Sequence, residues 1–152
     1  MPPVNPLWIR FTSATHLCLY RMTGGLIGGN VVGAPVLLLT TTGRKSGRPR
    51  TRPLPCLEED GAYVVIGSNG GNATHPNWYL NLKKQPEAEI LLKGKRRRVR
   101  AETATGADRE RLWAKAVEMY AGYQGYQKET EREIPVVVLR PVEHEVGEKA
   151  NR

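Results

Sequence analysis

The chain has 152 residues, 39% of them hydrophobic, and its 23 Lys and Arg against 15 Asp and Glu give a formal net charge of +8. This length predicts one domain with its own core, and the hydrophobic content excludes wholesale disorder. The two cysteines, Cys18 and Cys56, make neither a disulfide framework nor a metal-binding spacing, so a reducing compartment is expected.

The N-terminal segment lacks a basic stretch followed by a clean apolar run, which argues against a signal peptide. No stretch of 18 uncharged apolar residues exists, which argues against a membrane-spanning helix. Residues 7–22 instead predict an amphipathic helix that ends at the glycines of 23–25. This helix packs on the domain or rests on a membrane surface, where Arg10 and Arg21 would meet anionic lipid.

The chain divides into an N-terminal helix and linker at 1–34, a domain at 35–141 and a polar tail at 142–152. Within the domain, strand patterns come in hairpins and helices are inserted rather than strictly alternating. This organisation predicts an α+β fold with a mostly antiparallel sheet or small barrel of about six strands and about three helices.

Apolar and β-branched runs predict the strands. The run at 35–42 is continuously apolar, which is typical of a strand buried on both faces. Pro53 and Pro55 lack a backbone N–H and confine the next strand to a sheet edge or a bulge. Hairpin turns at 58–61 and 93–95 separate the later runs. The further strands are predicted at 51–57, 62–67, 88–92, 96–103 and 134–139.

Two helices are predicted inside the domain. Pro76 is expected at the first position of a short helix over 76–84. Residues 105–108 (TGAD) resemble a capping box and open a second helix that continues through Met119. The glycines at 122 and 125 then break the helix, so an irregular loop is expected after it.

The positive charge is concentrated in two segments. Residues 43–52 hold five basic groups and residues 93–100 hold six, with no acid in either, so the rest of the chain sums to 8 − 11 = −3. The first segment lacks P-loop spacing, but a Gly-rich turn exposes backbone N–H groups to which Lys45, Ser46 and Arg50 add donors. An anion site and a solvated turn are both consistent with it.

The basic segments also allow two other interpretations. Residues 46–50 partly match the minor-groove hook of DNA-binding proteins, but Ser46 stands where the hook requires arginine. In the second segment, Arg96, Arg98 and Arg100 share one face of a strand. That face is either solvated or attracts an anionic ligand or acidic lipid.

Two further segments contain residue types suited to a ligand site. Residues 68–71 (SNGG) follow a strand, and small residues there let a ligand approach the backbone; a plain loop is the alternative. Tyr120, Tyr123 and Tyr126 recur every third residue, and their phenols suit a flat aromatic ligand or a packed helix end. The three histidines have no metal spacing, and no Ser/His/Asp or Cys/His set stands out.

Taken together, four segments resemble the deazaflavin-dependent nitroreductase family, the actinobacterial oxidoreductases that use coenzyme F420. The segments are LLLTTTGRKSGRPRTRPLP, GSNGG, HPNWYLNLKKQPEAEI and MYAGYQGYQKETEREIPVVVL, and they cover about residues 35–141 in order. The resemblance implies an FMN-binding-like split β-barrel. It also implies hydride transfer from reduced F420 to an electron-poor acceptor, a quinone, an enone or lactone, or a nitro compound. The cofactor carries this chemistry and the protein supplies orientation and electrostatics.

The resemblance also implies roles for individual residues. The first basic segment would hold the phosphate and acidic tail of the cofactor, and a tyrosine or Ser68 would donate the proton that completes reduction. The implied catalytic residues are Tyr120, Tyr123, Tyr126 and Ser68. The implied cofactor-binding residues are Arg44, Lys45, Ser46, Gly47, Arg50, Pro53, Leu54, Ser68, Asn69, Gly70, Gly71, Pro76, Trp78 and Asn81.

The chain departs from nitroimidazole-activating members of that family at two positions. Pro55 stands where they carry tyrosine, and Asn69 stands where they carry lysine. These departures argue against nitroimidazole activation but leave hydride transfer untouched. The alternatives are an FMN-dependent oxidoreductase on the same fold and a basic nucleic-acid-binding module. For the reductase, we expect a cytoplasmic location, a small-molecule acceptor, no metal and no nucleic acid. Peripheral membrane contact through the first helix stays open beside packing of this helix on the domain.

Overall fold

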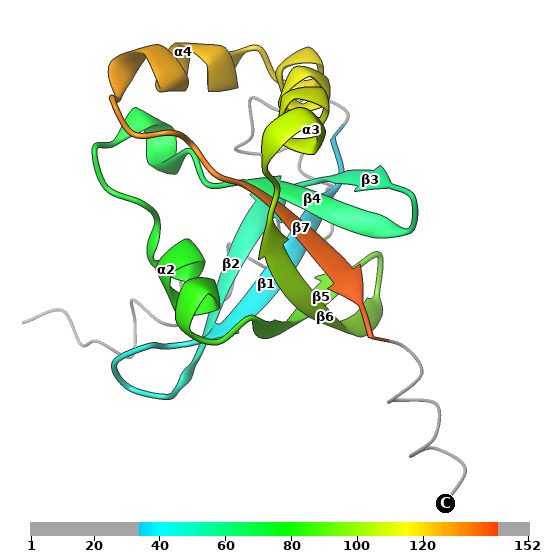
Figure 1. Ribbon diagram of the computed structural model, residues 1–152. Helices are drawn as coiled ribbons and strands as arrows, with labels where there is room; N and C mark the ends of the chain where they lie inside the picture. The colour runs from blue at the N-terminus through cyan, green and yellow to red at the C-terminus, as the bar shows by residue number, and fades with distance from the viewer. Residues whose placement is uncertain (1–33, 143–152) are drawn as a thin grey trace, which may run out of the picture.

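The computed structural model describes residues 34–142, so the predicted N-terminal helix and polar tail lie outside the described residues. Seven strands form one curled sheet in the order β2-β1-β5-β6-β7-β4-β3, and each neighbouring pair is antiparallel (Figure 1). The strands are β1 Val36–Thr42, β2 Pro49–Pro55, β3 Leu57–Glu59, β4 Ala62–Ile66, β5 Glu87–Leu92, β6 Lys95–Thr103 and β7 Val136–Pro141. The predicted α+β, antiparallel fold is confirmed.

The sheet has one strand more than predicted, because the segment at 51–57 contributes to two strands, β2 and β3. Between them, the backbone N–H of Cys56 donates to the carbonyl oxygen of Pro35 at 2.9 Å, which continues the β1–β2 register by one residue before β3 begins. β2 lies at the edge of the sheet and pairs with β1. The edge position predicted from Pro53 and Pro55 is therefore confirmed, since neither residue can donate to a second neighbouring strand.

Two hydrophobic clusters lie on opposite faces of the sheet, and β4 and β7 contribute to both. In β4, Tyr63 and Val65 pack into the first cluster with α2 (Asn77–Lys84), whereas Val64 and Ile66 pack into the second cluster with α3 (Gly106–Met119) and α4 (Gly122–Glu129). All five residues of β4 are buried as a result. Strand β7 alternates in the same way.

The prediction that the first strand is buried on both faces is wrong. In β1, Leu37, Leu39 and Thr41 are buried, but the alternate residues are half-buried or, at Thr42, exposed. Its continuously apolar sequence is typical of a strand with cover on both sides. Within residues 34–142, that arrangement belongs to β4 and β7 instead, because helices and the inner core flank those two strands.

The helices differ from the predictions in their details. Pro76 is the N-cap of α2 rather than its first helical residue. The predicted capping box at the start of α3 does not form, because Thr105 makes no side-chain cap hydrogen bond and Gly106 has a φ of +59°. The buried Trp78 and Tyr79 of α2 join the first cluster.

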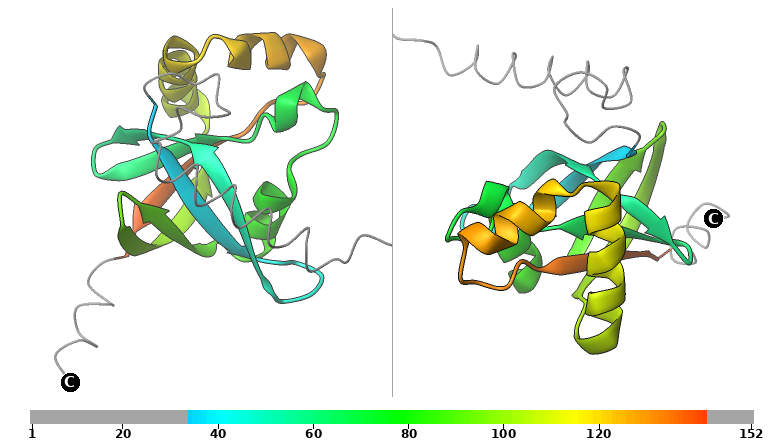
Figure 2. Two further views of the ribbon diagram at one scale, coloured as in Figure 1. Left: turned by 180° about the vertical axis from the view of Figure 1, so that it is seen from behind. Right: turned by 90° about the horizontal axis from the view of Figure 1, so that it is seen from above.

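The irregular loop predicted after α3 is also wrong, because α4 is a helix that meets α3 at a corner above the sheet (Figure 2). Gly122 is the first residue of α4, and a Cβ at this position would lie 2.3 Å from Cζ of Tyr120, so glycine leaves room for the tyrosine ring. Among residues 34–142, no helix has the length and apolar character needed to cross a membrane.

Candidate active site

A cavity of about 650 Å³ opens at the end of the sheet where β2, β4, α2 and the α3–α4 corner converge. This volume lies within the range of pockets that bind cofactors and other small molecules, about 300–1,000 Å³. The lining residues are Arg52, Pro53, Leu54, Pro55, Ile66, Ser68, Asn69, Gly70, Thr74, His75, Pro76, Asn77, Trp78, Tyr120, Tyr123 and Tyr126. The cavity therefore brings together most of the residues singled out from the sequence.

Three tyrosines close one end of this cavity. Tyr120 is the C-cap of α3, and Tyr123 and Tyr126 lie on α4. The hydroxyl oxygens of Tyr120 and Tyr126 are 3.2 Å apart, and the Tyr120 ring meets the Tyr123 ring edge-on with centroids separated by 5.1 Å. Burial raises the pKa of Tyr123, and the hydrogen bond with Tyr120 raises the pKa of Tyr126. These two phenols are therefore protonated at neutral pH and able to donate.

The segment after β4 forms a short 3₁₀ turn, η1 (Asn69–Gly71), beside α4. Its three residues have φ values of +47°, +62° and +82°, a region that glycine adopts without strain. A Cβ on Gly71 would lie 3.3 Å from Cα of Tyr126, so Gly71 lets the turn approach α4 closely. Ser68, Asn69 and Gly70 line the cavity, whereas Gly71 faces the helix.

The first basic segment forms the turn between β1 and β2, and α2 holds this turn in place. Oδ1 of Asn81 accepts hydrogen bonds from the backbone N and from Nη1 of Arg44, both at 3.1 Å. Nη2 of Arg44 donates to Oδ1 of Asn77 at 3.3 Å, and Nζ of Lys84 donates to the carbonyl oxygen of Arg44 at 2.9 Å. Asn81, only 3% exposed, also donates to Oγ1 of Thr41 at 3.1 Å. Arg44 and Asn81 thus anchor the turn and lie outside the cavity lining.

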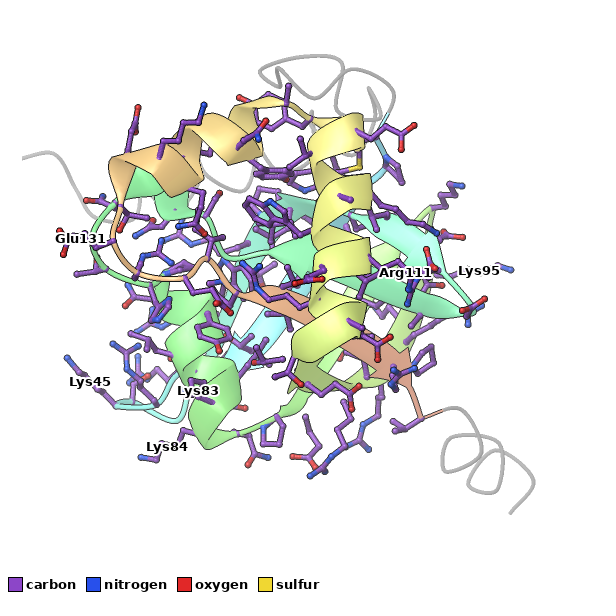
Figure 3. All side chains as sticks on the ribbon, turned by 45° about the horizontal axis from the view of Figure 1, so that its top comes forward. Lys45, Lys83, Lys84, Lys95, Arg111 and Glu131 are labelled. Carbon is purple, nitrogen blue, oxygen red and sulfur yellow. The ribbon has the colours of Figure 1, made fainter. Side chains whose placement is uncertain are left out.

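Lys45, Ser46, Gly47 and Arg50 are exposed and lie outside the cavity lining. Strand β2 connects this basic turn to the cavity. Pro49 begins the strand, and Arg52, three residues later and about 10 Å away at the usual strand rise, lines the cavity. Figure 3 shows Lys45, Lys83 and Lys84 at the same end of the molecule. Exposed positive charge therefore lies at the end of the molecule next to the cavity.

The second basic segment lies at the opposite end of the sheet (Figures 1 and 3). The first basic turn follows β1 and the turn at 93–95 follows β5, and these two neighbouring strands are antiparallel. Nη1 of Arg96 is 2.9 Å from Oε1 of Glu89, and Arg100 pairs with Glu87 on the same exposed face. The arginines are exposed, as both interpretations of this face require. The cross-strand glutamates also neutralise part of its charge.

Sequence reasoning missed several lining residues, among them Arg52, Thr74, His75 and Asn77. Arg52 carried a signal, since it belongs to the basic segment and directly precedes Pro53. Thr74 and His75 lie in the connection between the 3₁₀ turn and α2, whose path no periodicity indicates, and Asn77 is the first residue of α2. Among the described residues, no group of His, Cys, Asp and Glu has the arrangement of a metal site. Burial raises the pKa of Cys56 to about 12, so this cysteine is not an available thiolate nucleophile.

Comparison with known proteins identifies the family. The model of the F420H(2)-dependent quinone reductase family matches residues 12–141. The chain belongs to this family. The resemblance inferred from the sequence is confirmed, and the family match extends further toward the N-terminus than the quoted segments.

Individual relatives agree with this assignment. The F420H(2)-dependent quinone reductase Rv1261c of Mycobacterium tuberculosis is 44% identical over 128 residues, which are 82% of this chain and 86% of that protein. The solved structure of the F420-H2 dependent reductase FDR-A is 40% identical, with a TM-score of 0.65, and covers 74% of this chain and 100% of FDR-A.

A more distant neighbour shows the fold alone. The heme storage protein HutZ of Vibrio cholerae is 14% identical, with a TM-score of 0.55, and the match covers 84% of this chain and 88% of that chain. The curled sheet is therefore shared with proteins of different function, and function has to be argued from the site.

Proposed function

We propose that the chain is an F420H2-dependent quinone reductase whose active site is the cavity enclosed by β2, η1, α2 and the three tyrosines. The observation that carries the proposal is the match of the quinone reductase family to residues 12–141, together with this cavity beside a cationic turn. When bound, reduced F420 supplies a hydride from its deazaflavin ring. A quinone that accepts the hydride and one further proton becomes a hydroquinone.

The residues present fit the cofactor's chemistry. Pro53, Leu54 and Trp78 give the cavity apolar walls for a flat ring, and Ser68, Asn69 and Gly70 bring polar groups and backbone close to it. Lys45 and Arg50 at the turn supply charge for the phosphate and acidic tail. Arg44 acts differently, since its guanidinium is engaged with Asn77 and Asn81 and holds the turn in position.

The tyrosines orient the acceptor and supply its proton. Tyr120 and Tyr126 share a hydrogen bond between their hydroxyls, so a proton lost from one phenol to the acceptor can be replaced through the other. The raised pKa of Tyr126 keeps its phenol protonated at neutral pH and makes it a weaker acid than a free phenol, so its proton is transferred as the reduced quinone oxygen gains negative charge. Ser68 lies in the same cavity and is the alternative donor.

Two more specific proposals concern which acceptors are reduced and where in the cell the protein is located. Pro55 and Asn69, the two departures from nitroimidazole-activating relatives, both line the cavity, so we expect quinones to be reduced in preference to nitroimidazoles. Reduction of other nitro compounds, enones or lactones is a property to be measured. Cytoplasmic location and membrane contact by the N-terminal segment stay predictions.

The test is cofactor binding by the variant Lys45→Ala, with Lys95→Ala as the matched control. Both remove one exposed lysine, but the two residues lie at opposite ends of the molecule (Figure 3). Titration with F420 at low salt, followed by fluorescence, should show an affinity weakened about 2- to 5-fold in Lys45→Ala and unchanged in Lys95→Ala, the size expected for one exposed charge pair. Equal effects would contradict a specific role for the turn, and no binding by the wild type would contradict the proposed function.

A further inference from the structure

Arg132, in the connection between α4 and β7, binds the segment that links β4 to α2. Its Nη2 donates to the carbonyl oxygen of Ser68 at 2.8 Å, and its Nε donates to that of Asn72 at 2.9 Å. Its Nη1 is 3.2 Å from the carbonyl oxygen of Gly67 and 3.0 Å from Nδ1 of His75. One guanidinium therefore holds both ends of a segment that forms one wall of the cavity.

The contact with Arg132 determines which nitrogen of His75 carries the proton. A guanidinium has five N–H donors and no acceptor, and it stays protonated in proteins. Nδ1 of His75 must therefore accept from Nη1 of Arg132, and it is unprotonated while this contact exists. The proton of the neutral imidazole then lies on Nε2. Each of the other bonds of Arg132 is to a fixed backbone carbonyl, so the guanidinium cannot easily turn away.

The surroundings of His75 favour its neutral form. The pKa of His75 is lowered by desolvation and by two positive charges, Arg132 from the α4–β7 connection and Lys83 from α2. Tyr79 of α2 packs against the imidazole, with ring centroids 5.0 Å apart. Among the described residues, no carboxylate pairs with His75. His75 is one of the residues that line the cavity, and with Nδ1 occupied by Arg132, Nε2–H is the hydrogen-bond donor that its imidazole retains for a bound molecule.

We propose that Arg132 is a positioning residue that holds His75 as a neutral imidazole whose Nε2–H donates a hydrogen bond to a carbonyl oxygen of a ligand in the cavity. The identity of this ligand rests on the proposed function, since a deazaflavin ring and a quinone both present carbonyl oxygens. The state of His75 in the ligand-free protein does not rest on it.

The first experiment measures the tautomer without any ligand. Imidazole ¹⁵N signals of the labelled full chain are assigned by comparison with His75→Gln, and they should show Nε2 protonated and Nδ1 not, with a titration midpoint below the ordinary pKa of about 6.5. In Arg132→Leu, the signals should move toward a mixture of tautomers and the midpoint should rise. Arg132→Lys keeps a charged donor and should restore part of both properties. A mixture of tautomers or a protonated Nδ1 in the wild type would overturn the proposal.

The second experiment locates the ligand oxygen. His75→Leu removes the donor, His75→Gln keeps an N–H near the position of Nε2, and both leave the three carbonyl bonds of Arg132 in place. Loss of one such bond should weaken binding about 3- to 10-fold in His75→Leu and less in His75→Gln. A weaker F420 dissociation constant assigns the oxygen to the cofactor. A higher KM for menadione at unchanged F420 affinity assigns it to the quinone.

The controls separate this proposal from the proposed function. If His75→Leu has wild-type thermal stability and neither constant changes, the donor role is overturned. If the wild type does not bind F420, the proposed function fails, whereas the tautomer measurement still decides whether Arg132 positions His75.

Discussion

Gly71 and Gly70 are adjacent glycines with positive φ, yet substitution by alanine should affect them differently. Their φ values are +82° and +62°, so a side chain at either position is strained. A Cβ on Gly70 has no other atom within 4 Å. On Gly71 it would lie 2.6 Å from Oε2 of Glu129 and 3.3 Å from Cα of Tyr126. The Glu129 side chain can move aside, but the Tyr126 backbone belongs to α4 and cannot move without the helix.

Backbone strain at positive φ and crowding by the added Cβ set the expected loss in the free energy of unfolding. A left-handed conformation costs an alanine about 1–2 kcal/mol, which is the whole effect expected for Gly70→Ala. Overpacking against α4 adds about 1–3 kcal/mol, so Gly71→Ala should lower the free energy of unfolding by about 2–5 kcal/mol. Because Tyr123 and Tyr126 lie on α4, Gly71→Ala should also raise the KM for the quinone.

Urea unfolding of the two variants and the wild type measures the difference directly. The reasoning predicts a larger loss in Gly71→Ala than in Gly70→Ala at equal m-values. Equal losses would refute the claim that close contact between η1 and α4 requires a glycine at position 71.

Three further predictions concern α4, the basic turn and pH. Gly125→Ala should stabilise the protein by about 0.5–1 kcal/mol in thermal unfolding, since the added Cβ meets nothing within 4 Å, whereas Gly122→Ala should displace the Tyr120 ring and destabilise it. Asn81→Ala should weaken F420 binding in fluorescence titrations by releasing the turn, although Asn81 does not line the cavity. The pKa of Tyr126 is raised above that of a free phenol, so kcat should not fall through ionisation of this phenol between about pH 7 and pH 9; a fall in this range that disappears in Tyr126→Phe would contradict this.

The features of the fold that depend on neighbouring residues in the sequence could be predicted. Asp60 and Gly61 have φ values of +51° and +77°, as do Lys93 and Gly94, which is the geometry of tight hairpin turns. The edge position of β2 followed from its prolines. These features are local, because a turn or a missing N–H acts within a few residues.

The errors concern properties that only tertiary contacts decide. Helix α3 ends at Met119, as predicted, but Gly122 and Gly125 suggested an irregular loop after it. Burial of Tyr123 and the contact of α4 with η1 instead stabilise a second helix despite its glycines. The apolar run of β1 indicated burial on both faces, but which strands receive a second layer depends on where the helices dock. Arg132 could not be singled out, since its role requires four groups between Gly67 and His75 to lie around one guanidinium.

Catalysis of hydride transfer from reduced F420 to a quinone can be measured directly. Anaerobic mixing of catalytic amounts of protein with reduced F420 and menadione tests it, with the absorbance of oxidised F420 followed over time. The account predicts rapid reoxidation of one F420H2 per quinone reduced, saturating in both and slowed in Tyr126→Phe. Reoxidation no faster than in the protein-free mixture would contradict it.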